Sequence, residues 1–163
     1  MIDRQLITKL DFKNPATWLA TWFGCGLMKP GPGTWGTLGA LPMGVFLLAI
    51  GGPSLLLINI LGFFYIGLKV TEKFEAMTGT HDHGAVVIDE AVGVWIALLP
   101  AVLDPVHGLA AFALFRFFDI LKPWPVGWAD KKLPGAWGVM LDDVLAGLYA
   151  AAILGGFRYA GVI

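Results

Sequence analysis

The sequence of 163 residues has few charged side chains, only 14%, and a single cysteine, Cys25. Soluble domains are about a quarter charged, so this deficit, together with 57% hydrophobic residues and a mean hydropathy of +0.74, argues against an ordinary soluble fold. One cysteine excludes an internal disulfide. The net charge of −1 lacks the positive excess of a nucleic-acid-binding protein, so we expect no nucleic-acid partner. The composition indicates an integral membrane protein.

The apolar segments predict an all-α membrane bundle. Residues 36–68 contain no ionisable side chain, and one helix of that length would be about 50 Å long, too long for a hydrocarbon core of about 30 Å. Because Gly51-Gly52-Pro53 is a break signal, we expect a helical hairpin there, and a second hairpin is expected around residues 104–107. The predicted helices cover residues 36–51, 54–70, 86–103, 106–121 and 141–160.

The N-terminal part has a different character. Residues 1–15 are charged and have no apolar core, so we do not expect a cleavable signal peptide. Residues 14–27 hold Trp18 and Trp22 on one face of a short helix, which indicates a helix lying in the membrane interface. No linker divides the chain, and we predict a single domain, 1–163, of about four to five transmembrane helices plus this interfacial helix.

Basic residues lie on one side of the predicted topology. With five spans and a cytoplasmic N-terminus, every Lys and Arg except Arg158 falls in a cytoplasmic segment or at a cytoplasmic helix end. The same topology puts the acidic residues that interrupt apolar segments on the cytoplasmic side, and only Asp104 on the other. We therefore predict a polar cluster at the cytoplasmic surface.

Acidic residues recur where apolar segments begin or end. Carboxylates crowded together near low dielectric repel one another, and a divalent cation removes that conflict. Ligand sets made only of oxygen favour Mg²⁺ over zinc. The alternative is that the Asp89-Glu90 and Asp142-Asp143 pairs stabilise the first turns of two helices. We predict that Mg²⁺ is held by some of Asp82, Asp89, Glu90, Asp142 and Asp143.

The segment FRFFDILKPWP spaces Arg116, Asp119 and Lys122 along one helical face. These charges could neutralise one another as a ladder. However, an arginine among aromatic residues in a membrane helix is costly, which makes a functional role the default hypothesis. We predict that Arg116 and Lys122 bind phosphate oxygens, while Asp119 orients one of them or binds metal.

The segment KPGPGTWG, residues 29–36, precedes the first predicted span. Glycine permits close backbone approach, and the N-terminus of the following helix favours an anion. Gly33 and Thr34 are therefore candidate phosphate-binding residues, although the segment could simply start the helix.

The three histidines carry weaker signals. His81 and His83 flank Asp82, a spacing that is poor for zinc, so a proton-donor role is the functional alternative to a plain polar loop. We expect His107 to be an ordinary surface residue and Cys25 to be structural.

Four blocks occur in order along the chain: GPGTWGTLGALP, HDHGAVVIDEAVGVWIAL, FRFFDILKPWPVGWAD and GVMLDDVLAG. They resemble the motifs of the phosphatidylglycerophosphatase A family over about residues 22–155. The resemblance implies an all-helical, Mg²⁺-dependent enzyme of the bacterial inner membrane that removes the terminal phosphate of phosphatidylglycerophosphate. The implied catalytic candidates are Asp89, Glu90, Asp119, Asp142 and Asp143. Direct attack by water and an aspartyl-phosphate intermediate both remain compatible with these residues.

Other classes fit less well. An ion or proton transporter would use membrane carboxylates as a relay, but such sites lie near the middle of the membrane, often between inverted repeats. The chain lacks the Asp-x-Asp start of haloacid-dehalogenase phosphatases and the Asp-x₂-Asp-Gly-x₂-Ala-Arg motif of CDP-alcohol phosphotransferases. The enzyme hypothesis is therefore preferred, with a transporter as the alternative.

Overall fold

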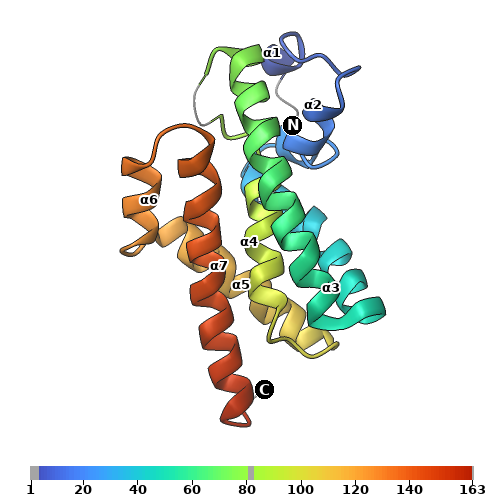
Figure 1. Ribbon diagram of the computed structural model, residues 1–163, viewed down its shortest axis with the longest axis vertical. Helices are drawn as coiled ribbons and strands as arrows, with labels where there is room; N and C mark the ends of the chain where they lie inside the picture. Colours follow the sequence, from blue (N-terminus) through green and yellow to red (C-terminus); the bar gives the residue numbers. More distant parts are fainter. Residues whose placement is uncertain (1–3, 81–82, 163) are drawn as a thin grey trace.

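The fold is all-helical, as the sequence predicts. The computed structural model describes residues 4–80 and 83–162, and these ranges contain helices and no strand (Figure 1). The helices are α1 (Arg4–Ile7), α2 (Pro15–Ala20), the 3-10 turn η1 (Cys25–Leu27), α3 (Pro32–Thr78), α4 (Ile88–Leu98), α5 (Pro105–Leu121), α6 (Val126–Lys132) and α7 (Ala136–Tyr159).

Helix α3 is a hairpin of two arms. Gly52 has φ 65° and ψ −168°, a conformation outside the helical region that suits glycine, and Pro53 follows it at the start of the second arm. Figure 1 shows the chain reversing direction at this point. The arms 32–51 and 53–78 are about 30 and 39 Å long at 1.5 Å per residue. The predicted break is confirmed, and the second arm is longer than expected.

Helix α4 lies at the centre of the bundle, between α3 and α7, and also contacts α5. Nearly all its residues are buried. Trp95 Nε1 donates a hydrogen bond to Ala40 O at 2.9 Å and ties α4 to the first arm of α3. The helix has 11 residues, about 16 Å, which is too short to cross a hydrocarbon core by itself. The sequence predicted a membrane segment over 86–103, whereas the structure has a shorter, interior helix.

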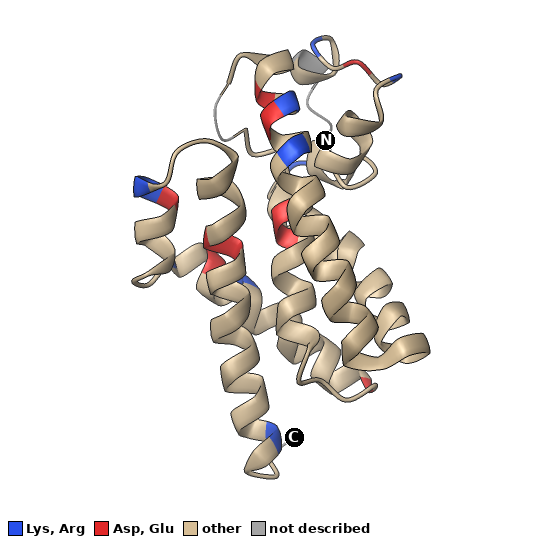
Figure 2. Ribbon diagram, in the orientation of Figure 1, with Lys and Arg blue, Asp and Glu red and all other residues tan. Residues whose placement is uncertain are grey.

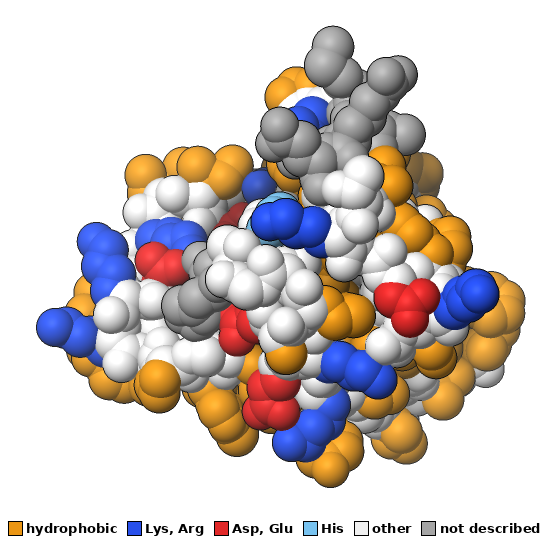
Figure 3. All heavy atoms as spheres, turned by 90° about the horizontal axis from the view of Figure 1, so that it is seen from above, with side chains coloured by type: hydrophobic (Ala, Val, Ile, Leu, Met, Phe, Trp, Pro, Cys, Tyr) orange, Lys and Arg blue, Asp and Glu red, His pale blue; other side chains and the backbone are white. Residues whose placement is uncertain are grey.

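Two helices in the described part of the chain, α3 and α7, are long and apolar enough to cross a membrane. The predicted count of four to five spans is not confirmed. Large apolar side chains are exposed along α3, namely Leu38, Phe46, Ile50, Leu57, Ile58, Leu61 and Tyr65. Soluble monomers rarely expose apolar patches of this extent. Seen from above, hydrophobic side chains cover much of the rim, and most charged side chains lie over the face (Figure 3), an arrangement consistent with a membrane protein.

The predictions for residues 14–27 and for His107 are wrong. Residues 14–27 do not form one helix, because α2 ends at Ala20 and Trp22 has a φ of 44°. Trp22 is buried, 3% exposed, with its ring centroid 5.4 Å from that of Trp95, so it belongs to the core and not to an interfacial face. His107, predicted to be a surface residue, is also buried. Its Nδ1 pairs with Asp104 at the start of α5.

Candidate active site

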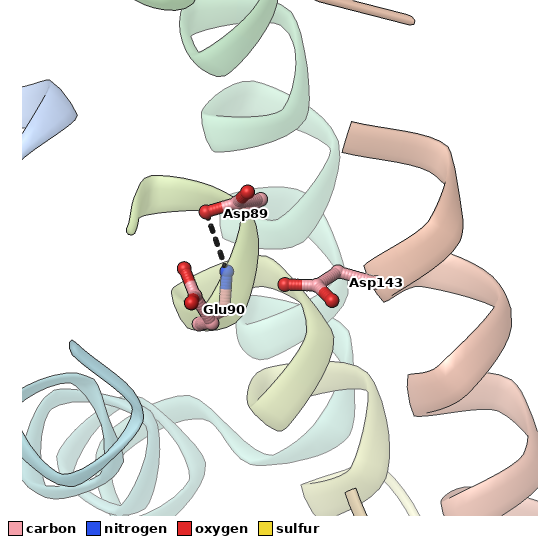
Figure 4. Close-up of side chains that lie close together, drawn as sticks. All are labelled: Asp89, Glu90 and Asp143. Carbon is pink, nitrogen blue, oxygen red and sulfur yellow. Dashed lines mark hydrogen bonds between the residues drawn. The ribbon is translucent and has the colours of Figure 1, made fainter. Parts of the chain in front are cut away.

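Acidic side chains from three helices meet where α4 begins. One carboxylate oxygen from each of Asp89, Glu90 and Asp143 lies within 4.8 Å of the others, and Asp119, Asp142 and Asp143 form a second group with the same spacing. The residues come from the start of α4, the end of α5 and the early part of α7. Figure 4 shows Asp143 pointing from α7 toward the first turn of α4. Because Asp143 belongs to both groups, they form one continuous acidic cluster.

Glycines explain why the carboxylates approach so closely. Asp89 and Gly93 are four residues apart on α4, and Asp143 and Gly147 are four apart on α7, so each pair shares a helical face. A Cβ at Gly147 would lie 2.4 Å from Gly93 O, which means that only glycine fits where the backbones of the two helices meet. Small residues permit such close helix contacts. Because Asp89 and Asp143 each lie one turn before the glycine of their helix, this contact brings the two carboxylates close together.

The cluster is buried and acidic. Asp89, Asp142 and Asp143 are 8%, 6% and 3% exposed. Two backbone amides contribute hydrogen bonds: Glu90 N donates to Asp89 Oδ1 at 3.0 Å and Asp143 N donates to Asp142 Oδ1 at 2.9 Å. Asp142 and Asp143 lie in the second turn of α7, so the alternative of stabilising a helix N-terminus does not account for them. Asp89 and Glu90 do lie in the first turn of α4, as that alternative required.

A divalent cation fits this donor set. Crowded carboxylates of like charge are unfavourable in a low-dielectric site unless a cation compensates them. Among the described residues, the buried Glu90 Oε2 has no hydrogen-bond partner, so this acceptor is left without a donor. The donors are all oxygens, which favours Mg²⁺ over softer metals.

Arg116 lies beside the cluster. Its Nη1 is 2.6 Å from Asp119 Oδ2 and 3.9 Å from Glu90 Oε1. Within the part of the chain that the structure describes, its buried Nε has no partner. The guanidinium is therefore held by one carboxylate while keeping donor capacity for an anion.

The start of α3 contributes backbone to this region. A Cβ on Gly33 would lie 2.2 Å from Glu90 Oε1 and 3.0 Å from Arg116 Nη1, so Gly33 packs directly against both side chains. Thr34, predicted to bind phosphate, is exposed. Thr37, one turn later, is buried; its Oγ1 donates to Gly33 O at 2.7 Å and accepts from Arg116 Nη1 at 3.5 Å. Sequence reasoning missed Thr37 because nothing distinguishes it from a helix-interior threonine.

Lys122 joins α5, α6 and α7. It ends α5 in a left-handed conformation with φ 45°, and its Nζ lies 2.6 Å from Asp130 Oδ1 and 2.7 Å from Asp142 Oδ2. Burial opposes the ammonium charge, but the two carboxylates outweigh it and raise the pKa of Lys122 above its ordinary value. Lys122 therefore stays charged beside the cluster. Asp130 was not predicted, because its pairing depends on how α6 folds back.

The histidine loop is only partly described. Asp82, a predicted metal ligand, and His81 lie outside the described residues. His83 Nδ1 accepts a hydrogen bond from Ala85 N at 3.2 Å, and its ring lies against Phe74 with centroids 5.9 Å apart. These contacts give His83 a role in shaping the loop.

The helical fold and its site define a class of protein. Buried carboxylates for a hard cation next to a guanidinium for oxyanions are the elements of phosphoryl chemistry, so the chain has the form of an all-helical phosphatase.

Comparison with known proteins agrees. The family model described as Phosphatidylglycerophosphatase A matches residues 18–158. The chain is 45% identical to phosphatidylglycerophosphatase A of Haemophilus influenzae over 161 residues, covering 98% of each chain. It is 37% identical to the Escherichia coli protein of the same name over 148 residues, covering 90% of this chain and 86% of that one. No solved structure matches. The chain belongs to the phosphatidylglycerophosphatase A family.

Proposed function

We propose that this protein is a Mg²⁺-dependent lipid phosphatase that hydrolyses phosphatidylglycerophosphate to phosphatidylglycerol and phosphate. The names of its family and relatives support the substrate. The observation that carries the proposal is the sharing of Asp143 between two groups of carboxylates from α4, α5 and α7. This geometry suits a phosphomonoester, whose negative charge needs cations on more than one side.

The chain's residues divide the work between metal and phosphate. Asp89, Glu90 and Asp143 are the proposed Mg²⁺ ligands, with Asp142 and Asp119 beside them. Bound Mg²⁺ would polarise the phosphoryl group and lower the pKa of a water. Arg116 binds phosphate oxygens through the donors that Asp119 leaves unused, and so neutralises charge that develops in the transition state. A carboxylate of the cluster accepts the proton of the attacking water.

We further propose that the enzyme is a multi-pass protein of the bacterial inner membrane, with the cluster at the cytoplasmic face. The apolar α3 and α7, and the placement of nearly all basic residues in predicted cytoplasmic segments, support this orientation. The acyl chains of the substrate would then lie in the inner leaflet while its phosphate reaches the cluster. A transporter gains little from this arrangement, since the carboxylates of the cluster lie where α4 begins and α5 ends, and most acidic positions are in the upper half of Figure 2.

The test is phosphate release from phosphatidylglycerophosphate in detergent. Asp89→Asn and Asp143→Asn should each lower Mg²⁺-dependent kcat by at least about 100-fold, because even residues that only support metal ligands affect metal sites by 10–100-fold. Chelation should abolish wild-type activity, and added Mg²⁺ should restore it. Asp104→Asn, at the opposite end of α5, is the matched control and should keep normal turnover. Near-normal rates in both site variants would contradict the proposal.

A further inference from the structure

A cationic pocket adjoins the acidic cluster. It has a volume of about 310 Å³ and is lined by Lys122, Trp124, Gly127, Trp128, Lys131 and Lys132. The lining thus contains three lysines and, among the residues that the structure describes, no carboxylate. We call it the α6 pocket. Lys131 and Lys132 supply ammonium groups that suit a phosphate, whereas the Nζ of Lys122 is already paired with Asp130 and Asp142.

The way α6 packs creates this pocket. A Cβ on Gly127 would lie 2.7 Å from Lys122 O, so α6 rests directly on the turn that ends α5. Val126 and Ala129, on the inner face of α6, are fully buried. Trp124 and Trp128 consequently face outward, 80% and 50% exposed. Tryptophans of this kind lie at the level of lipid headgroups, so the pocket opens where a phospholipid headgroup would lie.

Lys122 connects the pocket with the cluster. The same side chain that lines the α6 pocket has its Nζ 2.7 Å from Asp142 Oδ2, and Asp142 belongs to the carboxylate cluster. An anion in the pocket would therefore sit next to a phosphate at the cluster. Phosphatidylglycerophosphate carries two phosphates of this kind: the terminal monoester that is cleaved, and a phosphodiester on the other side of a glycerol unit.

We propose that the α6 pocket binds the phosphodiester of the lipid substrate, with Lys131 and Lys132 as specificity-determining residues. This inference rests on the proposed function. The cluster and Arg116 take the monoester, and the pocket recognises the group that distinguishes this substrate from a simple phosphomonoester. Phosphatidylglycerol, the product, keeps the phosphodiester and has lost the monoester, so it should occupy the α6 pocket and compete with the substrate.

The experiment uses the full chain in neutral detergent micelles with Mg²⁺. The variant Lys131→Ala/Lys132→Ala should raise the KM for phosphatidylglycerophosphate and the inhibition constant of phosphatidylglycerol by about tenfold each, the loss expected for about 1.4 kcal/mol of charge-assisted binding. Inorganic phosphate is the product released at the monoester site, so its inhibition constant should change by much less than tenfold. Lys69→Ala/Lys73→Ala removes the same charge from exposed positions on α3 and should alter none of these values.

Several results would overturn the inference. One is that the α6 variant keeps the wild-type KM and the wild-type inhibition by phosphatidylglycerol. Others are that inhibition by inorganic phosphate weakens as much as inhibition by phosphatidylglycerol, or that the α3 variant changes these constants as much as the α6 variant does. A wild-type enzyme that phosphatidylglycerol does not inhibit would also overturn it. Failure of the proposed function is distinguishable, because the wild type would then release no phosphate or Asp143→Asn would remain active. With Asp143→Asn inactive and the α6 variant unaltered, only the assignment of the pocket falls.

Discussion

Arg116 is the residue at which the positive and negative parts of the site meet. Asp119 holds its Nη1 at 2.6 Å, while Glu90 lies further away at 3.9 Å. An arginine carries five N–H donors in a rigid plane, and a single close carboxylate leaves several of them for phosphate. The position of the guanidinium therefore also depends on the backbone of Gly33, which packs against it.

Gly33→Ala tests this boundary. The added methyl would meet Glu90 Oε1 at 2.2 Å and Arg116 Nη1 at 3.0 Å, so both side chains must move. Displacement of reacting groups by about 1 Å can lower rates by about 10²-fold, and we expect a loss of that order in kcat/KM for phosphatidylglycerophosphate.

The control for that substitution is Gly62→Ala in the same helix, where a Cβ would have nothing within 4 Å. Alanine favours helix over glycine by roughly 0.5–1 kcal/mol, so neither variant should unfold the protein through helix propensity. Thermal unfolding of both variants checks this. Full activity in Gly33→Ala would show that the cluster does not need Gly33 at its boundary.

Single residues differ in how well the sequence reveals them. Asp89, Glu90, Asp142 and Asp143 could be identified because charges inside apolar segments need compensation. Thr37 and Asp130 could not, since each acquires its role from a partner 79 or 8 residues away that only the folded chain supplies. A charged residue inside an apolar segment is visible in a sequence, whereas the partner that a side chain meets in the folded chain is not.

At the scale of elements, α5 depends on Asp104 for its N-terminus. Asp104 Oδ1 accepts from Val106 N at 2.7 Å and His107 N at 3.0 Å, and its other oxygen pairs with the His107 ring. These hydrogen bonds, led by the one from the His107 backbone, lower the pKa of Asp104 below its ordinary value. A lowered folded-state pKa means that the charged form stabilises the fold.

Asp104→Ala should therefore lower Tm, and its effect should depend on pH. The contribution of the Asp104 carboxylate to the free energy of unfolding is complete above the unfolded-state pKa of about 3.9. It disappears as the pH falls through the lower folded-state pKa. The Tm difference between wild type and Asp104→Ala should be constant from pH 5 to 7 and narrow in more acidic buffer. Asp104→Asn keeps a side-chain cap and should lose less. A gap that widens in acid would contradict this role.

Element boundaries were predicted unevenly. The Gly52-Pro53 break fixed the α3 hairpin because glycine and proline act locally. The extent of α4 was overestimated, since an apolar run reads the same in a lipid-facing helix and in a buried one. Burial of α4 among α3, α5 and α7 is a property of the assembled bundle.

The whole molecule has two unlike ends. The carboxylate cluster lies where α4 begins and α5 ends, whereas Arg158 at the end of α7 donates from Nη1 to Pro100 O at 2.9 Å, beyond the end of α4. Asp104 lies at that second end as well. The apolar surface of α3 separates the two ends, so a bilayer around it would hold the cluster on one side only.

That asymmetry predicts which side each end faces. The single cysteine allows a clean background, Cys25→Ala, into which Lys73→Cys is introduced near the cluster end or Leu103→Cys at the opposite end. If most basic residues mark the cytoplasm, a membrane-impermeant thiol reagent should label Leu103→Cys in intact spheroplasts and Lys73→Cys only in inverted vesicles. Detergent should make both equally reactive. The reverse pattern would mean that the reaction centre faces outward, and labelling of both from one side would mean that α3 does not cross the membrane between them.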